Sequence, residues 1–209
     1  MGAPARHNGR MTPTESTRAA RAAETRSQLV AVGRELFAER GFAATSTEDI
    51  VLQAGVTRGA LYYHFRDKQD LFRAVFTAVE EDVDRHVTAA AMLEGEPWSG
   101  LVSGCAAYLD ASLDPATQRI ALIDAPAVLG WEAWRAIGSQ NRFGLLATAL
   151  TWAIAAGEIA DQPLAPLVHV LLGALNEGAL YIARSADRRG ARDEVAAVIE
   201  RLLASLRSA

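Results

Sequence analysis

Apolar residues recur every three or four positions along most of the chain, which is the spacing of amphipathic helices. In the first clear case, 24–40, the apolar stripe comprises Leu29, Val32, Leu36 and Phe37. Further helices are expected at 68–92, 98–113, 131–156, 167–185 and 192–206, with glycine and proline residues between them. Another is expected to start at Asp114-Pro115 and to be interrupted at Ala125-Pro126. No segment alternates as a β-strand does, so the pattern predicts an all-α fold.

The stretch 45–68 predicts two short helices joined by a tight turn. Ser46 can cap the first helix, with Asp49 as its partner in a capping box. Gly55 can adopt the left-handed conformation that ends a helix, and Thr57 can cap the second helix, which has the sequence RGALYYHF. Asp67 can cap the helix that follows. The cap residues therefore set the limits of each helix in this stretch.

The second of these short helices has one apolar side and one polar side. Leu61 and Phe65 lie four residues apart and are expected to face inward, while Tyr62, Tyr63 and His64 lie on the outer side. A helix, a glycine-containing turn and a second helix form the pattern of a helix-turn-helix, whose second helix enters the major groove of DNA. An ordinary helical hairpin has the same spacing, but neighbouring exposed aromatic residues favour a surface that contacts a partner.

The charge of the chain divides unevenly. The net charge of the 209 residues is −4, but residues 1–75 contain 11 basic and 8 acidic residues and carry +3, whereas residues 76–209 carry −7. Attraction to DNA depends on the local field, so a basic N-terminal part on an acidic body is compatible with DNA binding. The N-terminal residues 1–23 lack apolar periodicity and contain four arginines, which indicates either a mobile basic arm or a solvated tail.

Several classes of function lack support in the sequence. The chain contains no nucleophile elbow, zinc-protease, P-loop or dinucleotide motif, so we expect no enzyme, and we expect no cofactor. Acidic residues 80, 81, 82 and 84 are expected to form a solvated helix face and not a metal site. The longest uncharged runs are shorter than the roughly 20 residues of a bilayer span, which predicts no membrane association. The single Cys105 fits a small core residue and a reducing cytoplasm.

The segment GFAATSTEDIVLQAGVTRGALYYHFRDKQDLFRAV resembles the N-terminal DNA-binding domain of TetR-type transcriptional regulators. Two later segments, LIDAPAVLGWEAWR and LLGALNEGALYIA, resemble the C-terminal ligand-binding domain of one subgroup of that family. The resemblance implies a helix-turn-helix head at 24–75 and a helical ligand-binding and dimerisation body at 76–209. It also implies a dimeric repressor that leaves an inverted-repeat operator in double-stranded DNA when a small apolar or amphipathic inducer binds. A DNA-binding regulator or architectural protein without ligand control is the alternative.

The resemblance also implies roles for individual residues of the head. Four residues would contact phosphates: Thr47, Tyr63, His64 and Lys68. Four would face bases: Arg58, Gly59, Ala60 and Tyr62. Among these, Arg58 is the best candidate for a bidentate contact to guanine, and Gly59 and Ala60 permit a close approach. For Tyr62, a packed core position is the alternative.

In the body, aromatic and polar residues on apolar helices are candidates for an inducer pocket. They are Trp98, Tyr108, Trp131, Trp134, Phe143, Trp152, His169, Asn176 and Glu177. A helix-turn-helix head reads one half-site, so a two-fold interface is expected, and the last two helices provide candidates for a four-helix bundle. They are Gly173, Ala174, Gly178, Ala179, Val195, Ile199, Leu202 and Leu206. Packing of either set within one subunit is the alternative.

Overall fold

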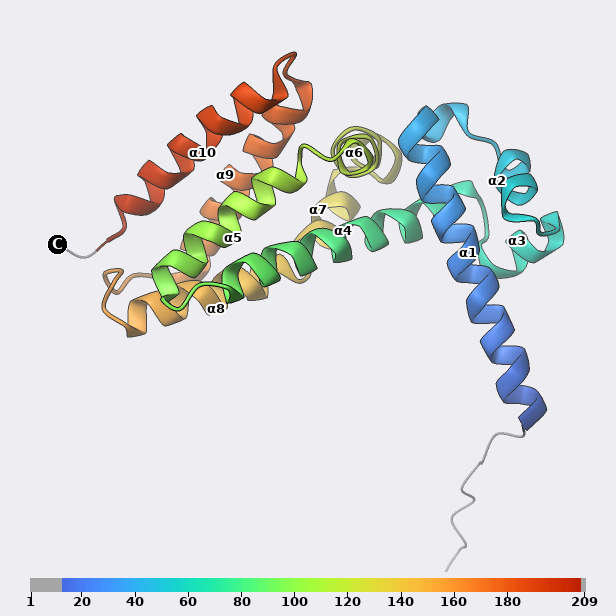
Figure 1. Cartoon of the computed structure of the whole chain (residues 1–209), viewed down its shortest axis with the longest axis horizontal. Coiled ribbons are helices and arrows are strands. Elements are labelled where there is room, and N and C mark those ends of the chain that lie inside the picture. Colours follow the sequence, from blue (N-terminus) through green and yellow to red (C-terminus); the bar gives the residue numbers. More distant parts are fainter. Residues whose placement is uncertain (1–12, 208–209) are drawn as a thin grey trace, which may run out of the picture.

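The computed structural model describes residues 13–207, and its regular elements are helices (Figure 1). Within these residues the only β-type pairing is one isolated antiparallel bridge between Ile159 and Arg207. The all-α prediction is therefore confirmed. In chain order the elements are α1 (Pro13–Ala44), α2 (Thr47–Ala54), α3 (Arg58–His64), α4 (Lys68–Met92), α5 (Pro97–Ala111), the π-helix η1 (Thr117–Asp124), α6 (Ala125–Leu129), α7 (Trp131–Ser139), α8 (Arg142–Ala155), α9 (Leu164–Arg184) and α10 (Arg188–Ala204).

Helices α1 to α3 and the start of α4 form a small N-terminal head around an aromatic core. The rings of Phe37 and Phe42 both meet Phe72 edge-on, each with its centroid 5.1 Å from that of Phe72. Leu61 from α3 and Phe65 after it are fully enclosed beneath these helices, as their spacing predicts. Edge-to-face pairs add stabilisation to the burial of apolar surface, so this compact core holds α3 at a fixed angle.

Helix α1 begins earlier than expected. It starts at Pro13, so residues 13–23, which were expected to belong to a basic arm, are helical. Residues 1–12 of that expected arm lie outside the described residues. The helical conformation is interrupted at Gly41, where φ is +80° and ψ is 169°. The guanidinium of Arg119 from η1 lies against Gly41, and residues with a Cβ rarely adopt the positive φ found there, so this position favours glycine.

Helix α4 continues from the head into the body, so the expected boundary at residue 75 falls inside one continuous helix (Figure 1). Its body half packs against α5, and α8 and α9 complete a layer around α5. Helix α9 is the one described helix that is long and apolar enough to cross a membrane by composition alone. It packs against α5, α8 and α10, as a core helix of the body does.

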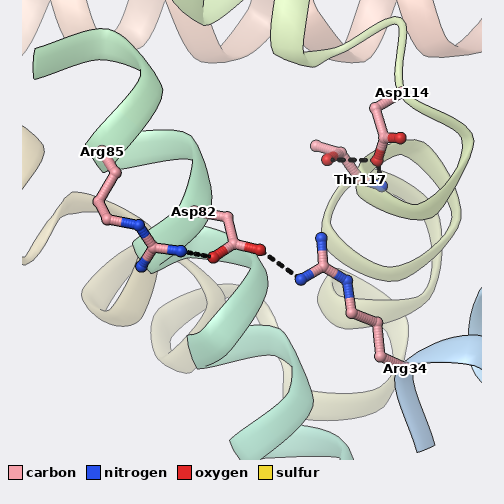
Figure 2. A network of polar contacts seen from close by, with 5 residues as sticks. All are labelled: Arg34, Asp82, Arg85, Asp114 and Thr117. Carbon is pink, nitrogen blue, oxygen red and sulfur yellow. Dashed lines mark hydrogen bonds and ion pairs between the residues drawn. The ribbon is translucent and has the colours of Figure 1, made fainter. Parts of the chain in front are cut away.

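The middle of the chain departs from the expected helix boundaries. The helix expected at 131–156 is two helices, α7 and α8, which meet at residues 140–141. The break has a tertiary cause, because α7 packs on η1 through a hydrogen bond from Trp134 Nε1 to the carbonyl of Ala121 (2.7 Å), while α8 begins with Arg142 turned into the interior. The predicted start at Asp114 is confirmed, since its carboxylate accepts bonds from the backbone N–H and the hydroxyl of Thr117 (Figure 2).

Candidate nucleic-acid interface and ligand cavity

Side-chain caps fix the two helices of the head hairpin. Ser46 Oγ accepts the N–H of Asp49, and Asp49 Oδ2 accepts the N–H of Ser46, both at 3.0 Å. The Ser46 hydroxyl, which donates to Asp49 Oδ2 at 2.6 Å, and the Ser46 N–H together hold the pKa of the Asp49 carboxyl below its ordinary value. Gly55 ends α2 with φ +64°, and Thr57 Oγ1 accepts the N–H of Ala60 at 3.2 Å. These three predicted caps are confirmed, as is Asp67, which accepts the N–H of Asp70 at 2.7 Å, and Gly55 and Thr57 connect α2 to α3 through a short turn of defined conformation.

Helix α3 turns an aromatic and cationic face to solvent. Tyr62 is 42% exposed and Tyr63 is 76% exposed, which excludes the alternative of Tyr62 as a packed core residue. The guanidinium of Arg58 lies 5.5 Å from the centre of the Tyr62 ring, and His64 meets Tyr63 edge-on at 4.9 Å. The exposed side of α3 therefore carries two contacting pairs, Arg58 with Tyr62 and Tyr63 with His64.

The N-terminus of α2 lies beside this face. Thr47 is half-buried at the first position of α2, and its hydroxyl donates to Glu48 at 3.1 Å. Glu48 forms an exposed ion pair with Arg58 at 3.2 Å. A backbone hydrogen bond, the Thr47 hydroxyl and the charge of Arg58 together hold the pKa of Glu48 below its ordinary value. Without DNA, the cation at the start of α3 therefore has an acidic partner from α2.

Lys68 lies at the first position of α4 and contacts the connection between α1 and α2. Its ammonium donates to the carbonyls of Phe42 and Thr45, both at 2.8 Å, and lies 4.2 Å from the centre of the Phe42 ring. Charge-assisted bonds to two carbonyls tie the start of α4 to this connection. Lys68 thus positions the hairpin, and the phosphate contact that the resemblance implied stays a prediction.

The body contains a cavity of about 1180 Å³ between α4, α5, α8 and α9, which opens to solvent beside the exposed residues Met92 and Trp152. Its wall is mostly apolar, with Val87, Leu101, Leu146, Leu172 and Leu175 among the lining residues. Pockets for small molecules typically measure about 300–1,000 Å³, so this one can hold a ligand of drug size. Cys105 is buried in the wall, as predicted for a small core residue, and burial raises the pKa of its thiol to about 12.

Of the nine residues predicted to bind ligand, Tyr108 and Trp152 line this cavity. Asn176 lies one layer behind, where its Oδ1 accepts the Tyr108 hydroxyl at 2.7 Å. The other six do not line it, because their side chains meet other partners or solvent. Trp134 is buried against η1, and the Trp131 ring packs on it at a tilt. The Phe143 ring packs on His169, and the guanidinium of Arg207 covers the Trp98 ring. Glu177 is exposed to solvent.

A buried charge cluster lies at one end of the cavity, and the sequence did not predict it. Glu80 and Asp84, expected on a solvated face, are only 7% and 8% exposed, because both face α8 and pair with the guanidinium of Arg142. Burial lowers the pKa of Arg142 to about 10, and burial together with the charge of Glu81 raises the pKa of Asp84. The signal available in the sequence was the four-residue spacing of Glu80 and Asp84 along the apolar side of α4.

The residues predicted for a dimer interface lie on α9 and α10, some of them buried within the subunit and others on its outer face. Gly178 packs against Val195 of α10, so these two serve the contact between α9 and α10, and Ala179 and Ile199 are buried within the subunit. Gly173 and Leu202 are exposed, and Ala174 and Leu206 are half-buried. An outer apolar face remains. We call it the α9/α10 face, and it comprises Val170, Gly173, Tyr181, Val198 and Leu202.

A capped helix-turn-helix head on a helical body with an internal cavity defines a class of helical transcription regulators, and comparisons with known proteins agree. The model described as bacterial regulatory proteins of the tetR family matches residues 29–75. The model described as the tetracyclin repressor-like C-terminal domain matches residues 98–206. A TetR-family transcriptional regulator from Pectobacterium atrosepticum is 34% identical in its crystal structure, with a TM-score of 0.82 over 91% of this chain and 97% of that chain.

Matches to characterised relatives cover less of the chain. The HTH-type transcriptional regulator AcrR of Shigella flexneri is 40% identical over 81 residues, which is 38% of each chain. The HTH-type transcriptional repressor BepR of Brucella suis is 45% identical over 56 residues, which is 27% of each chain. This chain therefore spans less than half the length of these two relatives. It belongs to the TetR family of transcriptional regulators and is not an enzyme.

Proposed function

We propose that this protein is a cytoplasmic, dimeric repressor that binds an inverted-repeat operator through α3 and leaves it when a small apolar or amphipathic ligand enters the body cavity. The observation that carries the proposal is the exposed face of α3 with Arg58, Tyr62 and Tyr63. Solvation alone gives no reason for adjacent exposed aromatic side chains beside a cation on a short, doubly capped helix. A DNA groove supplies acceptors and phosphates for all three.

Within this proposal, the residues of α3 divide by position. Arg58, Gly59, Ala60 and Tyr62 face bases, with Arg58 exchanging Glu48 for the acceptor atoms of guanine. A Cβ at Gly59 would have only the hydroxyl of Thr57 nearby, at 3.9 Å, so the surface there is open to close approach. Thr47, Tyr63 and His64 lie at the margins of the same face and contact phosphates.

Dimerisation is proposed through the α9/α10 face. Its members are three and eight residues apart on α9 and four residues apart on α10, so on each helix they lie on one side. Two helices from each subunit would form a four-helix bundle around a two-fold axis, which sets the separation of the two α3 helices. An apolar face of this kind has no role in an isolated subunit.

Ligand control requires contacts that differ between two states, and two polar links join the body to the head. Asp82 on α4 pairs with Arg34 from α1 and with Arg85, which lines the cavity (Figure 2). Asp124 at the end of η1 accepts the N–H of Phe42 at 2.7 Å. We propose that a ligand displaces Arg85 and the α7–α8 turn, and that these links carry the movement to α1.

The test uses DNA that flanks the gene of this protein, searched for an inverted repeat and labelled for fluorescence anisotropy. We expect two subunits to bind one repeat in preference to unrelated DNA, with the preference falling when Arg58 is replaced. Binding of equal strength to every duplex, or a strictly monomeric protein bound to the repeat, would contradict the proposal. If the protein keeps its full affinity for DNA at saturating concentrations of every ligand that binds the cavity, the alternative of a DNA-binding regulator or architectural protein without ligand control is favoured.

A further inference from the structure

One end of the cavity carries one uncompensated negative charge. Two carboxylates, Glu80 and Asp84, share the single guanidinium of Arg142, and all three groups are buried. Asp84 Oδ1 lies 3.2 Å from Arg142 Nε, and Glu80 pairs with the Nη2 atom of the same guanidinium. One cation cannot neutralise two carboxylates, and an uncompensated buried charge is costly, so this end is short of one positive charge.

The remaining groups near Asp84 do not supply that charge. The Tyr108 hydroxyl is engaged by Asn176, and Asn141 contributes only a neutral amide bond to Asp84. At the exposed edge, Glu81 adds a second acid. Arg85 faces the cavity there, but it pairs with Asp82, as Figure 2 shows, together with Arg34. The edge is therefore neutral as a whole, and the deficit stays at Asp84.

The charged groups that line the cavity lie toward one end of it. On α4 they are Glu81, Asp84 and Arg85, and the lining continues from Asp84 to Met92 over about 12 Å along the helix axis. The walls beyond Asp84 are formed by apolar or small residues of α5 and α8, including Leu101, Gly104, Ala149 and Trp152. A matching ligand therefore has a long apolar body and one polar head.

We propose that the cavity selects an apolar amphiphile with a single protonated amine, whose ammonium head donates to Asp84 and whose body lies along α4 toward Met92. This inference rests on the proposed function of the cavity as a ligand site. An ammonium brings the buried cluster of Glu80, Asp84 and Arg142 to neutrality and adds a charged donor for the Asp84 carboxylate. A carboxylate head would raise the buried negative charge, because Arg142 already serves two acids. A neutral alcohol would supply a donor but no charge.

The test compares three probes that differ only in the head: octylamine, which is protonated at pH 7, 1-octanol and octanoate. Isothermal titration with the wild-type protein at pH 7 should give an octylammonium Kd at least about tenfold below that of octanol, with octanoate weakest. Asp84→Asn should reduce the preference for the amine over the alcohol to about threefold or less. Glu81→Gln, which changes an acid at the exposed edge of the same cavity, should retain it.

Three results would overturn the inference: octanol or octanoate binding as tightly as the amine, no binding by any probe, or a full amine preference in Asp84→Asn. Circular dichroism melting of each variant confirms that it is folded. Anisotropy on the flanking DNA, measured on the same preparations, separates the two proposals. Amine selectivity without DNA binding would remove the proposed repressor function alone, whereas DNA binding without amine selectivity would remove this ligand class alone.

Discussion

The head and the body of this protein distribute charge and apolar surface in opposite ways. In the head, the core around Phe37 and Phe72 is apolar, and the cation of α3, Arg58, is exposed. In the body, Glu80, Asp84 and Arg142 are buried, while large apolar residues such as Trp152 and Val170 are exposed. A head of this kind presents a fixed surface to a polyanion. A body of this kind holds groups that a ligand or a second subunit would satisfy.

Matched replacements of one arginine in each region give the strongest test of this contrast. Arg142→Met should lower the free energy of unfolding by about 3–5 kcal/mol, because it leaves two buried carboxylates without a cation. Urea denaturation followed by circular dichroism at pH 7 measures the loss. The triple variant Glu80→Gln, Asp84→Asn, Arg142→Met should recover most of it. No recovery would mean that Arg142 acts through its packing and not through its charge.

In the head, the same replacement at Arg58 should affect recognition and not stability. Arg58→Met should weaken binding to the flanking inverted repeat by about 1–3 kcal/mol, or roughly tenfold to hundredfold, because one bidentate base contact is lost. Binding to unrelated DNA should change far less. Anisotropy titrations with both duplexes measure the difference, and Arg189→Met on α10 provides a control of equal charge change. Equal losses on both duplexes would assign Arg58 to phosphate.

Lys68 tests whether a cation in the head serves the fold or the DNA. Lys68→Met should lower the free energy of unfolding by about 1–3 kcal/mol, because the carbonyls of Phe42 and Thr45 lose their donor. If Lys68 serves only the fold, the dependence of DNA affinity on salt should keep its slope. A decrease of about one in that slope would instead restore the phosphate role that the resemblance implied.

The smallest expected effect concerns pH. The pKa of Asp84 is raised in the folded protein above its ordinary value of 3.8, so the folded state binds more protons than the unfolded state over that interval. The stability of the wild type relative to Asp84→Asn should therefore be greatest in acid and fall as the pH rises above about 3.8. Denaturation curves for both proteins between pH 3.5 and 7, spanning that ordinary value, measure this trend. A relative stability that rises with pH would mean that Arg142 compensates Asp84 fully.

What the sequence determined lies mostly in the head. The caps at Ser46, Gly55 and Thr57 act within about four residues, so the order of residues alone fixes the hairpin. The helical period then places Leu61 inside and Tyr63 outside. The all-α class and most helices of the body follow from the same period, because each helix records its buried side in its own spacing.

Only the tertiary structure decided the site in the body. The sequence predicts that Glu80 and Asp84 are solvated, but in the fold α8 places Arg142 against them. The long helix expected at 131–156 breaks because α7 packs on η1. The same holds for Lys68, whose carbonyl partners lie 26 and 23 residues away. Local spacing indicates which side of a helix is apolar, but it carries no information about which distant group contacts that side. The chemistry of a cavity depends on those long-range contacts.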